Sequence, residues 1–284
     1  MRSTVTITVE TGDADGRTLL APAGAPTPYE TCTGFAVEGG DFDVIQEAHT
    51  GQDAALIRPS GRGPVTVTYS YSDGGTGYPE PLFIHRPNRY TTAADELAQE
   101  SQRAAGTSAD GHAAIAGIAG IAGIANEVAQ KFRYGHAEVR FNDGMDEIPY
   151  LSCGLTEGSC VDINSYLIAS LRAAGFEAGY VTGYFFPEEK NGVCDDMHCW
   201  VVTRHHDVMQ EWDIAHHLKL GKRDIEAALN PKPGVRRAVA HSMGLDFPDL
   251  GIADLKLMAE PVWLDADGTI DRSRVAIRFD RTDG

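Results

Sequence analysis

Apolar and polar residues alternate in the first part of the chain. Val5, Ile7 and Val9 are separated by threonines, and the run 65–71 has the same branched and aromatic character. Clusters of Gly, Pro and Asp separate such runs, as in strands that are joined by turns. The pattern predicts a β-sandwich-like domain over residues 1–88.

Closely spaced prolines between residues 79 and 90 indicate a linker, and we therefore predict a second domain over residues 89–284. Helices are expected at 91–105 and 224–229. In the run 113–125, isoleucines and glycines each recur at every third position. This period carries the isoleucines around the helix axis, so the run predicts a helix with apolar contacts on several sides. It is too short to span a bilayer.

A more regular helical pattern follows in the middle of the chain. Ile163, Leu167, Leu171 and Ala174 recur at the spacing of one buried helix face, and Gly175 is a typical C-terminal cap. These residues predict a helix that begins close to residue 160.

Cys160 falls in the first turn of that helix, after the good N-cap residue Ser159. Helix N-termini present unpaired N–H groups and positive partial charge, which lower the pKa of a thiol and favour the reactive thiolate. A buried cysteine can also be a simple packing residue. Its position therefore makes Cys160 a candidate nucleophile but does not by itself establish one.

The polar segment 204–207 lies between two apolar, branched or aromatic runs and predicts the turn of a β-hairpin. If the turn is centred on the bond between His205 and His206, His198 on the first strand faces Asp213 on the second. The imidazole could then bond to the carboxylate through one nitrogen and face a thiol with the other. A one-residue bulge would place the two side chains on opposite faces.

Together these segments resemble the transglutaminase-like superfamily of papain-related enzymes. Five pieces occur in the family's order: Gly158-Ser159-Cys160, Arg172-Ala173-Ala174-Gly175, Val181-Thr182-Gly183-Tyr184, His198-Cys199-Trp200 and Trp212-Asp213. The resemblance covers roughly residues 110–250. It implies an α+β fold in which the cysteine helix packs on an antiparallel sheet, after an N-terminal β-sandwich-like domain.

The resemblance also implies a catalytic triad: Cys160 as the nucleophile, His198 as the general base and acid, and Asp213 as the carboxylate that orients the imidazole. This assignment agrees with the chemistry, because a thiol needs an adjacent base and the base needs a group that fixes its tautomer. The expected reaction is acyl transfer from an amide through a Cys160 thioester, with the Cys160 N–H as one oxyanion donor.

The composition of the chain excludes several classes of binding partner. The net charge of −17 argues against binding of a nucleic-acid backbone, which requires clustered Lys and Arg. No apolar run of 18 residues and no leader-like run is present, so a membrane span and a signal peptide are not expected. The five cysteines are odd in number and do not indicate a disulfide framework. A cytoplasmic enzyme acting on a peptide, protein or amide substrate is expected.

Two alternatives to the triad stay open. One is a metal site in the dense Cys/His region, formed from Cys153, Cys160, Cys194, His198, Cys199, His205, His206, His216 and His217. No Cys-x2-Cys pair is present, so no metal and no cofactor are expected. The other is a non-catalytic binding scaffold with the same fold. In the triad interpretation the histidines at 205, 206, 216 and 217 lie outside the catalytic set.

The acceptor of the acyl group also stays open. Water would make the protein a cysteine protease or amidase, whereas an amine would make it a transferase, and the triad is the same in both. Hydrolysis is favoured because bacterial members of the family that resemble this chain are mostly described as candidate cysteine proteases.

Overall fold

The computed structural model describes residues 2–12, 16–106, 117–228 and 230–282. The chain divides into two compact units that are discontinuous in sequence. The first unit contains residues 1–81, 182–197 and 234–284, and the second contains residues 82–181 and 198–233. The division into a domain over residues 1–88 and a domain over residues 89–284 stays a prediction.

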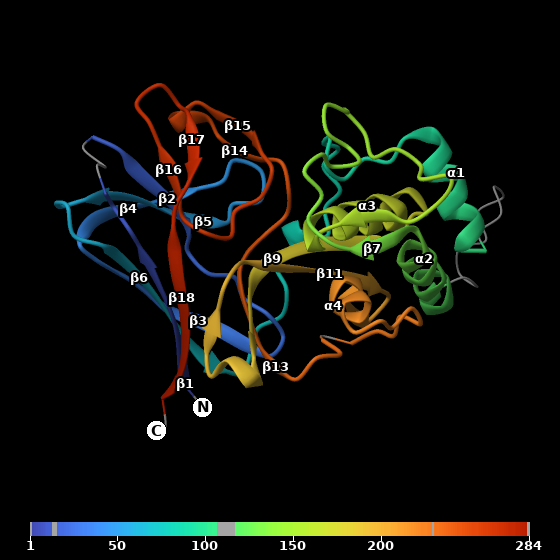
Figure 1. Ribbon diagram of the computed structural model, residues 1–284, viewed down its shortest axis with the longest axis horizontal. Helices are drawn as coiled ribbons and strands as arrows, with labels where there is room; N and C mark the ends of the chain where they lie inside the picture. Colours follow the sequence, from blue (N-terminus) through green and yellow to red (C-terminus); the bar gives the residue numbers. More distant parts are fainter. Residues whose placement is uncertain (1, 13–15, 107–116, 229, 283–284) are drawn as a thin grey trace. The chain divides into compact units, whose positions relative to one another are not determined.

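Two five-stranded sheets make up most of the first unit (Figure 1). The first has the order β10 (Val193–Cys194), β18 (Val275–Thr282), β1 (Arg2–Val9), β6 (Val65–Asp73) and β3 (Glu30–Glu38). The second has the order β17 (Ile270–Arg272), β16 (Val262–Leu264), β2 (Thr18–Pro22), β5 (Asp53–Pro59) and β4 (Gly40–Gln46). All the pairings recorded within the two sheets are antiparallel.

The alternation predicted for the N-terminal part is confirmed. Val5, Ile7 and Val9 of β1 are fully buried, whereas the residues between them are not. One apolar cluster contains these residues together with Leu19 of β2 and Ile57 of β5, so the two sheets enclose a common core. The predicted β-sandwich-like region is therefore present.

The remaining elements of the first unit lie outside these two sheets. They are β13 (Gly234–His241), β14 (Leu245–Phe247), β15 (Ile252–Leu255), and the 3-10 turns Glu188–Lys190 and Pro248–Leu250. A further 3-10 turn, Glu80–Leu82, lies where the chain leaves this unit for the other. The long strand β9 (Glu177–Pro187) begins in the second unit, and from Thr182 it belongs to the first, where it pairs with β13.

The second unit contains the four helices that the structure describes. They are α1 (Asp95–Ala104), α2 (Gly117–Lys131), α3 (Cys160–Ala173) and α4 (Ile214–Lys219), and all of the other three pack against α3. Its strands are β7 (Phe132–Tyr134), β8 (Thr156–Gly158), β11 (His198–His205), β12 (Val208–Trp212) and the first part of β9. Helix α3 also packs against β11, whose neighbours in the sheet are β9 and β12, as Figure 1 shows in part.

Most of the predicted helices are present. The described part of the Ile/Gly run forms α2, in which Gly120, Ile121 and Ile124 are buried; residues 113–116 lie outside the described residues. Helix α3 ends where expected, with Gly175 at φ +85°. The helix predicted at 224–229 is wrong: residues 224–228 are not helical, and residue 229 lies outside the described residues. No described helix is long and apolar enough to cross a membrane.

Candidate active site

Cys160 is the first residue of α3, and the sequence around it determines where the helix begins. The Ser159 backbone N–H and hydroxyl both donate to Asp162 Oδ2, at 2.9 and 2.6 Å, which ties the N-cap residue to the first turn. Residue 158 must be glycine, because a Cβ there would lie 2.9 Å from the Phe132 ring. Cys160 is 6% exposed, so the predicted nucleophile lies at a buried helix N-terminus.

Strands β11 and β12 form the predicted hairpin, but the predicted register is wrong. Val201 pairs with Trp212, which centres the turn on His206 and Asp207, one residue later than expected. His206 has φ 52°, a left-handed conformation in which histidine is enriched compared with most residues. The correction moves each cross-strand partner by two positions. Because side chains alternate with a period of two, the predicted imidazole and carboxylate keep the same face.

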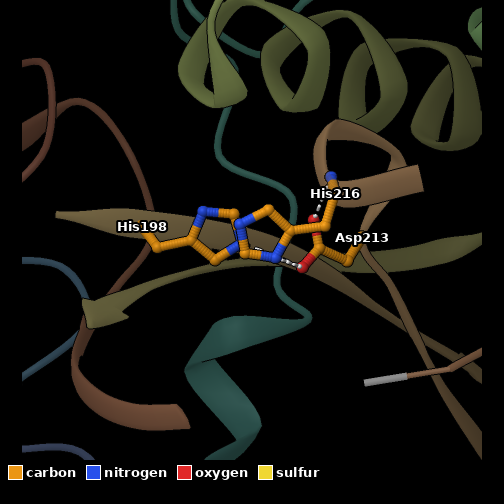
Figure 2. Close-up of side chains that lie close together, drawn as sticks. All are labelled: His198, Asp213 and His216. Carbon is orange, nitrogen blue, oxygen red and sulfur yellow. Dashed lines mark hydrogen bonds and ion pairs between the residues drawn. The ribbon is translucent and has the colours of Figure 1, made fainter. Parts of the chain in front are cut away.

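Asp213 follows β12 directly and is the N-cap residue of α4, so two elements fix its carboxylate. Oδ1 accepts the backbone N–H of His216 at 3.1 Å, and Oδ2 lies 2.9 Å from Nε2 of His198 (Figure 2). Asp213 is fully buried and His198 is 4% exposed. The structure therefore brings the predicted imidazole and carboxylate into direct contact.

The Cys160 side chain also acts on His198, and its interaction with the imidazole is one of the causes that raise the pKa of His198. Because Nε2 faces Asp213, the nitrogen that the ring offers to the thiol is Nδ1. Burial by itself lowers the pKa of His198, but the Asp213 carboxylate and the Cys160 thiol raise it by more. The pKa of His198 therefore stands above its usual value, and all three predicted site residues lie in one chain of contacts.

The Cys160 thiol has a second sulfur as a neighbour. A hydrogen bond with Cys199, followed by burial, raises the pKa of Cys160 well above its usual value, and His198 offsets only part of this. The direction of this shift opposes the stabilisation of the thiolate expected from the helix N-terminus. Asn164, one turn after Cys160, donates Nδ2–H to the Cys199 carbonyl at 2.9 Å and to its Sγ at 3.3 Å, which fixes the second thiol.

Replacing Cys199 with alanine is expected to speed alkylation of Cys160 near neutral pH. The change removes the largest cause of the raised pKa of Cys160, so more thiolate forms. For each unit by which that pKa falls, about ten times more thiolate forms, but each thiolate is about threefold less nucleophilic. The rate is therefore expected to rise about threefold per unit. The measurement is the rate of iodoacetamide labelling at Cys160, followed by peptide mass analysis. A rate equal to or below that of the unchanged protein would contradict the role given to Cys199.

One histidine that the sequence analysis left outside the site lies within it. The His216 ring stacks on the His198 ring, with centroids 4.0 Å apart and planes inclined by 7° (Figure 2). Its Nδ1 lies 3.1 Å from Asp213 Oδ2. Neighbouring His217 instead directs Nδ1 to the Asp213 backbone carbonyl at 2.8 Å. The sequence signal was the spacing: a residue three positions after an N-cap carboxylate can reach it.

Among the residues that the structure describes, these side chains form a group that could hold a metal ion. Ligand atoms of His198, Asp213 and His216 lie within 4.8 Å of one another, and all three residues are buried. The shared oxygen, Asp213 Oδ2, already has both imidazole nitrogens and the Asn230 amide within 3.1 Å. Two imidazoles and a carboxylate suit zinc, so this group carries the metal alternative and Cys160 is not part of it.

Comparisons with known proteins bear on this arrangement. Residues 102–212, which include Cys160, His198 and the end of β12, match the model of the transglutaminase-like superfamily. Residues 102–212 form a transglutaminase-like core. The family predicted from the five sequence pieces is therefore confirmed, as is the α+β fold. No curated protein matches the chain.

A solved structure has a similar fold over nearly the whole of the chain. A protein from Cytophaga hutchinsonii, described as a candidate cysteine protease, is 13% identical with a TM-score of 0.52, and the match covers 99% of this chain and 98% of that one. The periplasmic domain of TgpA from Pseudomonas aeruginosa, bound to ethylmercury, is 15% identical with a TM-score of 0.38, and covers 73% and 74%. At 13% identity the likeness to the Cytophaga hutchinsonii protein concerns the fold alone.

Proposed function

We propose that the transglutaminase-like core is a cysteine enzyme that cleaves amide bonds through a Cys160 thioester. The observation that carries the proposal is the buried chain of contacts from the Cys160 thiol through His198 to Asp213. A thiol with its own base, and a base with its own carboxylate, is the arrangement that covalent acyl transfer requires.

The reaction begins when His198 Nδ1 takes the Cys160 proton and the sulfur attacks the amide carbonyl. Asp213 keeps Nε2 protonated, so that only Nδ1 can accept, and stabilises the imidazolium that forms. When the tetrahedral intermediate collapses, the C–N bond breaks and the imidazolium gives its proton to the departing amine. The acyl group stays on Cys160 as a thioester.

The second half of the reaction decides the class of enzyme. His198 takes a proton from a water molecule, and the oxygen of that water attacks the thioester carbonyl. The C–S bond then breaks, the acid is released, and the His198 imidazolium returns the proton to the Cys160 sulfur. An amine in place of water would give transfer. We favour hydrolysis because the protein of similar fold from Cytophaga hutchinsonii is described as a candidate cysteine protease. The Cys160 backbone N–H, at the start of α3, is the proposed oxyanion donor.

The substrate is proposed to be a peptide, protein or other amide, and no cofactor takes part. All five cysteines are free thiols. The cytoplasmic location expected from their number stays a prediction.

The test is turnover of fluorescently labelled casein and of a peptide library, after dialysis against a chelator and with elemental analysis of the same sample. Activity is expected to survive chelation, because the thiol and imidazole supply both nucleophile and proton donor. One equivalent of iodoacetamide at Cys160 should abolish it. Parallel reactions with a fluorescent primary amine distinguish the acceptors: incorporation of the amine faster than hydrolysis would make the protein a transferase.

Two results would overturn the proposal. One zinc ion per chain, with activity lost when it is removed, would favour the metal alternative at His198, Asp213 and His216. No turnover, together with alkylation of Cys160 no faster than that of Cys153 or Cys194, would favour a binding scaffold.

A further inference from the structure

The structure contains a second imidazole at the carboxylate that orients His198. His216 is 4% exposed, stacks on His198 and brings Nδ1 to 3.1 Å from Asp213 Oδ2. A lone pair on that nitrogen would face a carboxylate oxygen at close range, which is unfavourable in a buried site. Nδ1 therefore carries the proton and donates it to Asp213.

Asn230 completes the set of donors. Its Oδ1 accepts the Lys232 backbone N–H at 2.7 Å, which identifies the opposite atom of the amide as Nδ2. That Nδ2 donates to Asp213 Oδ2 at 2.9 Å. It also lies in contact with His216 Nδ1, because both nitrogens converge on the same oxygen, and the charged carboxylate is the stronger acceptor for the hydrogens of both. Asp213 Oδ2 thus faces three donors from three parts of the chain, and the carboxylate charge is shared among them.

From this geometry we propose that His216 is a positioning residue for the Cys160–His198 pair. It acts in two ways: its N–H holds the Asp213 carboxylate in place and takes a share of its charge, and its ring face fixes the plane of the His198 ring. The inference rests on the proposed function, in which His198 accepts the thiol proton.

The neutral charge state of His216 suits its position against the His198 ring. Burial, together with the nearby His198 and Lys219 and only partly offset by Asp213, lowers the pKa of His216 to about 4. His216 therefore stays neutral at the pH values at which His198 is charged, and no second cation forms against the imidazolium. The other groups that act on His198 are Asp213 and, from α3, Cys160.

This sharing of the Asp213 charge predicts how turnover depends on pH. His198 must be neutral to accept the thiol proton, and its pKa stands above its usual value, so turnover should rise as the pH passes through that raised pKa. Replacing His216 with phenylalanine keeps a stacked ring but removes the donor. More of the carboxylate charge then acts on His198, and the rise should move to higher pH.

Two amide variants test whether the position of the donor nitrogen matters, or only the polarity of the side chain. His216→Asn places an amide nitrogen close to where Nδ1 lies, so it can still donate to Asp213. His216→Gln places it farther out, where Nε2 lies. We expect kcat to fall on the order of tenfold to a hundredfold in the Phe and Gln variants, as for other small losses of alignment, and much less in the Asn variant.

His217 provides the matched control. It is adjacent, equally buried at 3% exposed, and bonds to a backbone carbonyl rather than to the carboxylate. His217→Phe is expected to lower the melting temperature as much as His216→Phe does, but it should leave the pH of half-maximal turnover unchanged.

The measurements are kcat/KM on labelled casein against pH and, without any substrate, the rate of Cys160 alkylation against pH. Both profiles should move to higher pH in His216→Phe and His216→Gln and return in His216→Asn. If His216→Phe does not fold, the comparison of His216→Asn with His216→Gln still tests the inference.

Equal profiles for the Asn and Gln variants, or the same shift in His217→Phe, would overturn the inference, as would bound zinc that is lost with His216. The alkylation profile separates this failure from that of the proposed function. A casein-inactive protein whose Cys160 profile still depends on His216 would refute the function and keep the positioning role.

Discussion

Replacing Cys160 with alanine is expected to abolish turnover while leaving the protein folded. Without the sulfur no thioester can form, and His198 has no proton to accept, so the loss should be about a thousandfold or more, as for other nucleophile deletions. The change removes about one methyl-sized group from a buried site, which should cost about 1 kcal/mol of stability. Turnover of labelled casein and the thermal melting temperature are the two measurements.

Cys153 supplies the control for this prediction. It is a free and exposed thiol seven positions before Cys160, and Cys153→Ala should change neither rate nor melting temperature. If Cys160→Ala keeps turnover on a substrate that the unchanged protein cleaves, the nucleophile has been wrongly assigned.

Asp213→Ala is expected to lower both activity and stability, and it should be the more damaging to the fold. The carboxylate is fully buried and accepts from His198, from Asn230 and from both the backbone and the ring of His216. Loss of the α4 N-cap costs about 1 kcal/mol. Each buried donor left without an acceptor adds about 1–3 kcal/mol.

The effect on rate follows from the same contacts. Without Asp213, the pKa of His198 loses its main raising influence and the Nε2 proton is no longer held, so kcat should fall on the order of a hundredfold or more. Asp213→Asn keeps an acceptor oxygen and should recover more of the melting temperature than of the rate. An Asp213→Ala protein with the full rate would remove the carboxylate from the mechanism.

The cysteine helix could be predicted from sequence because its determinants are local. Four apolar positions at helical spacing indicate α3, Ser159 marks its start, and Gly175 at φ +85° marks its end, although every residue from Cys160 to Leu171 is buried and not one face alone. The contact between His198 and Asp213 was also predictable, although the register was wrong. The period of two along a strand preserves faces when a turn moves by one residue and each partner therefore moves by two.

Features that depend on distant parts of the chain could not be predicted in this way. Helix α4 has only six residues, too few for a recognisable period, so the role of His216 was missed and a helix was placed at 224–229 instead. Strand β3 has mostly half-buried positions that give no clear alternation. The raised pKa of Cys160 depends on Cys199, a neighbour that lies 39 positions further along the chain.

The discontinuous course of the chain limits how the unit with the proposed triad can be inherited or moved. Residues 82–181 and 198–233 form the unit with the proposed triad, and residues 182–197 between them belong to the other unit. No single continuous stretch of gene encodes either unit by itself. Recombination that carried residues 82–233 into another protein would also carry the second half of β9 and all of β10, strands that pair with β13 and β18 outside that stretch. We therefore expect the two units to have been exchanged together during evolution, and a fragment made only of residues 82–233 to expose unpaired strand edges.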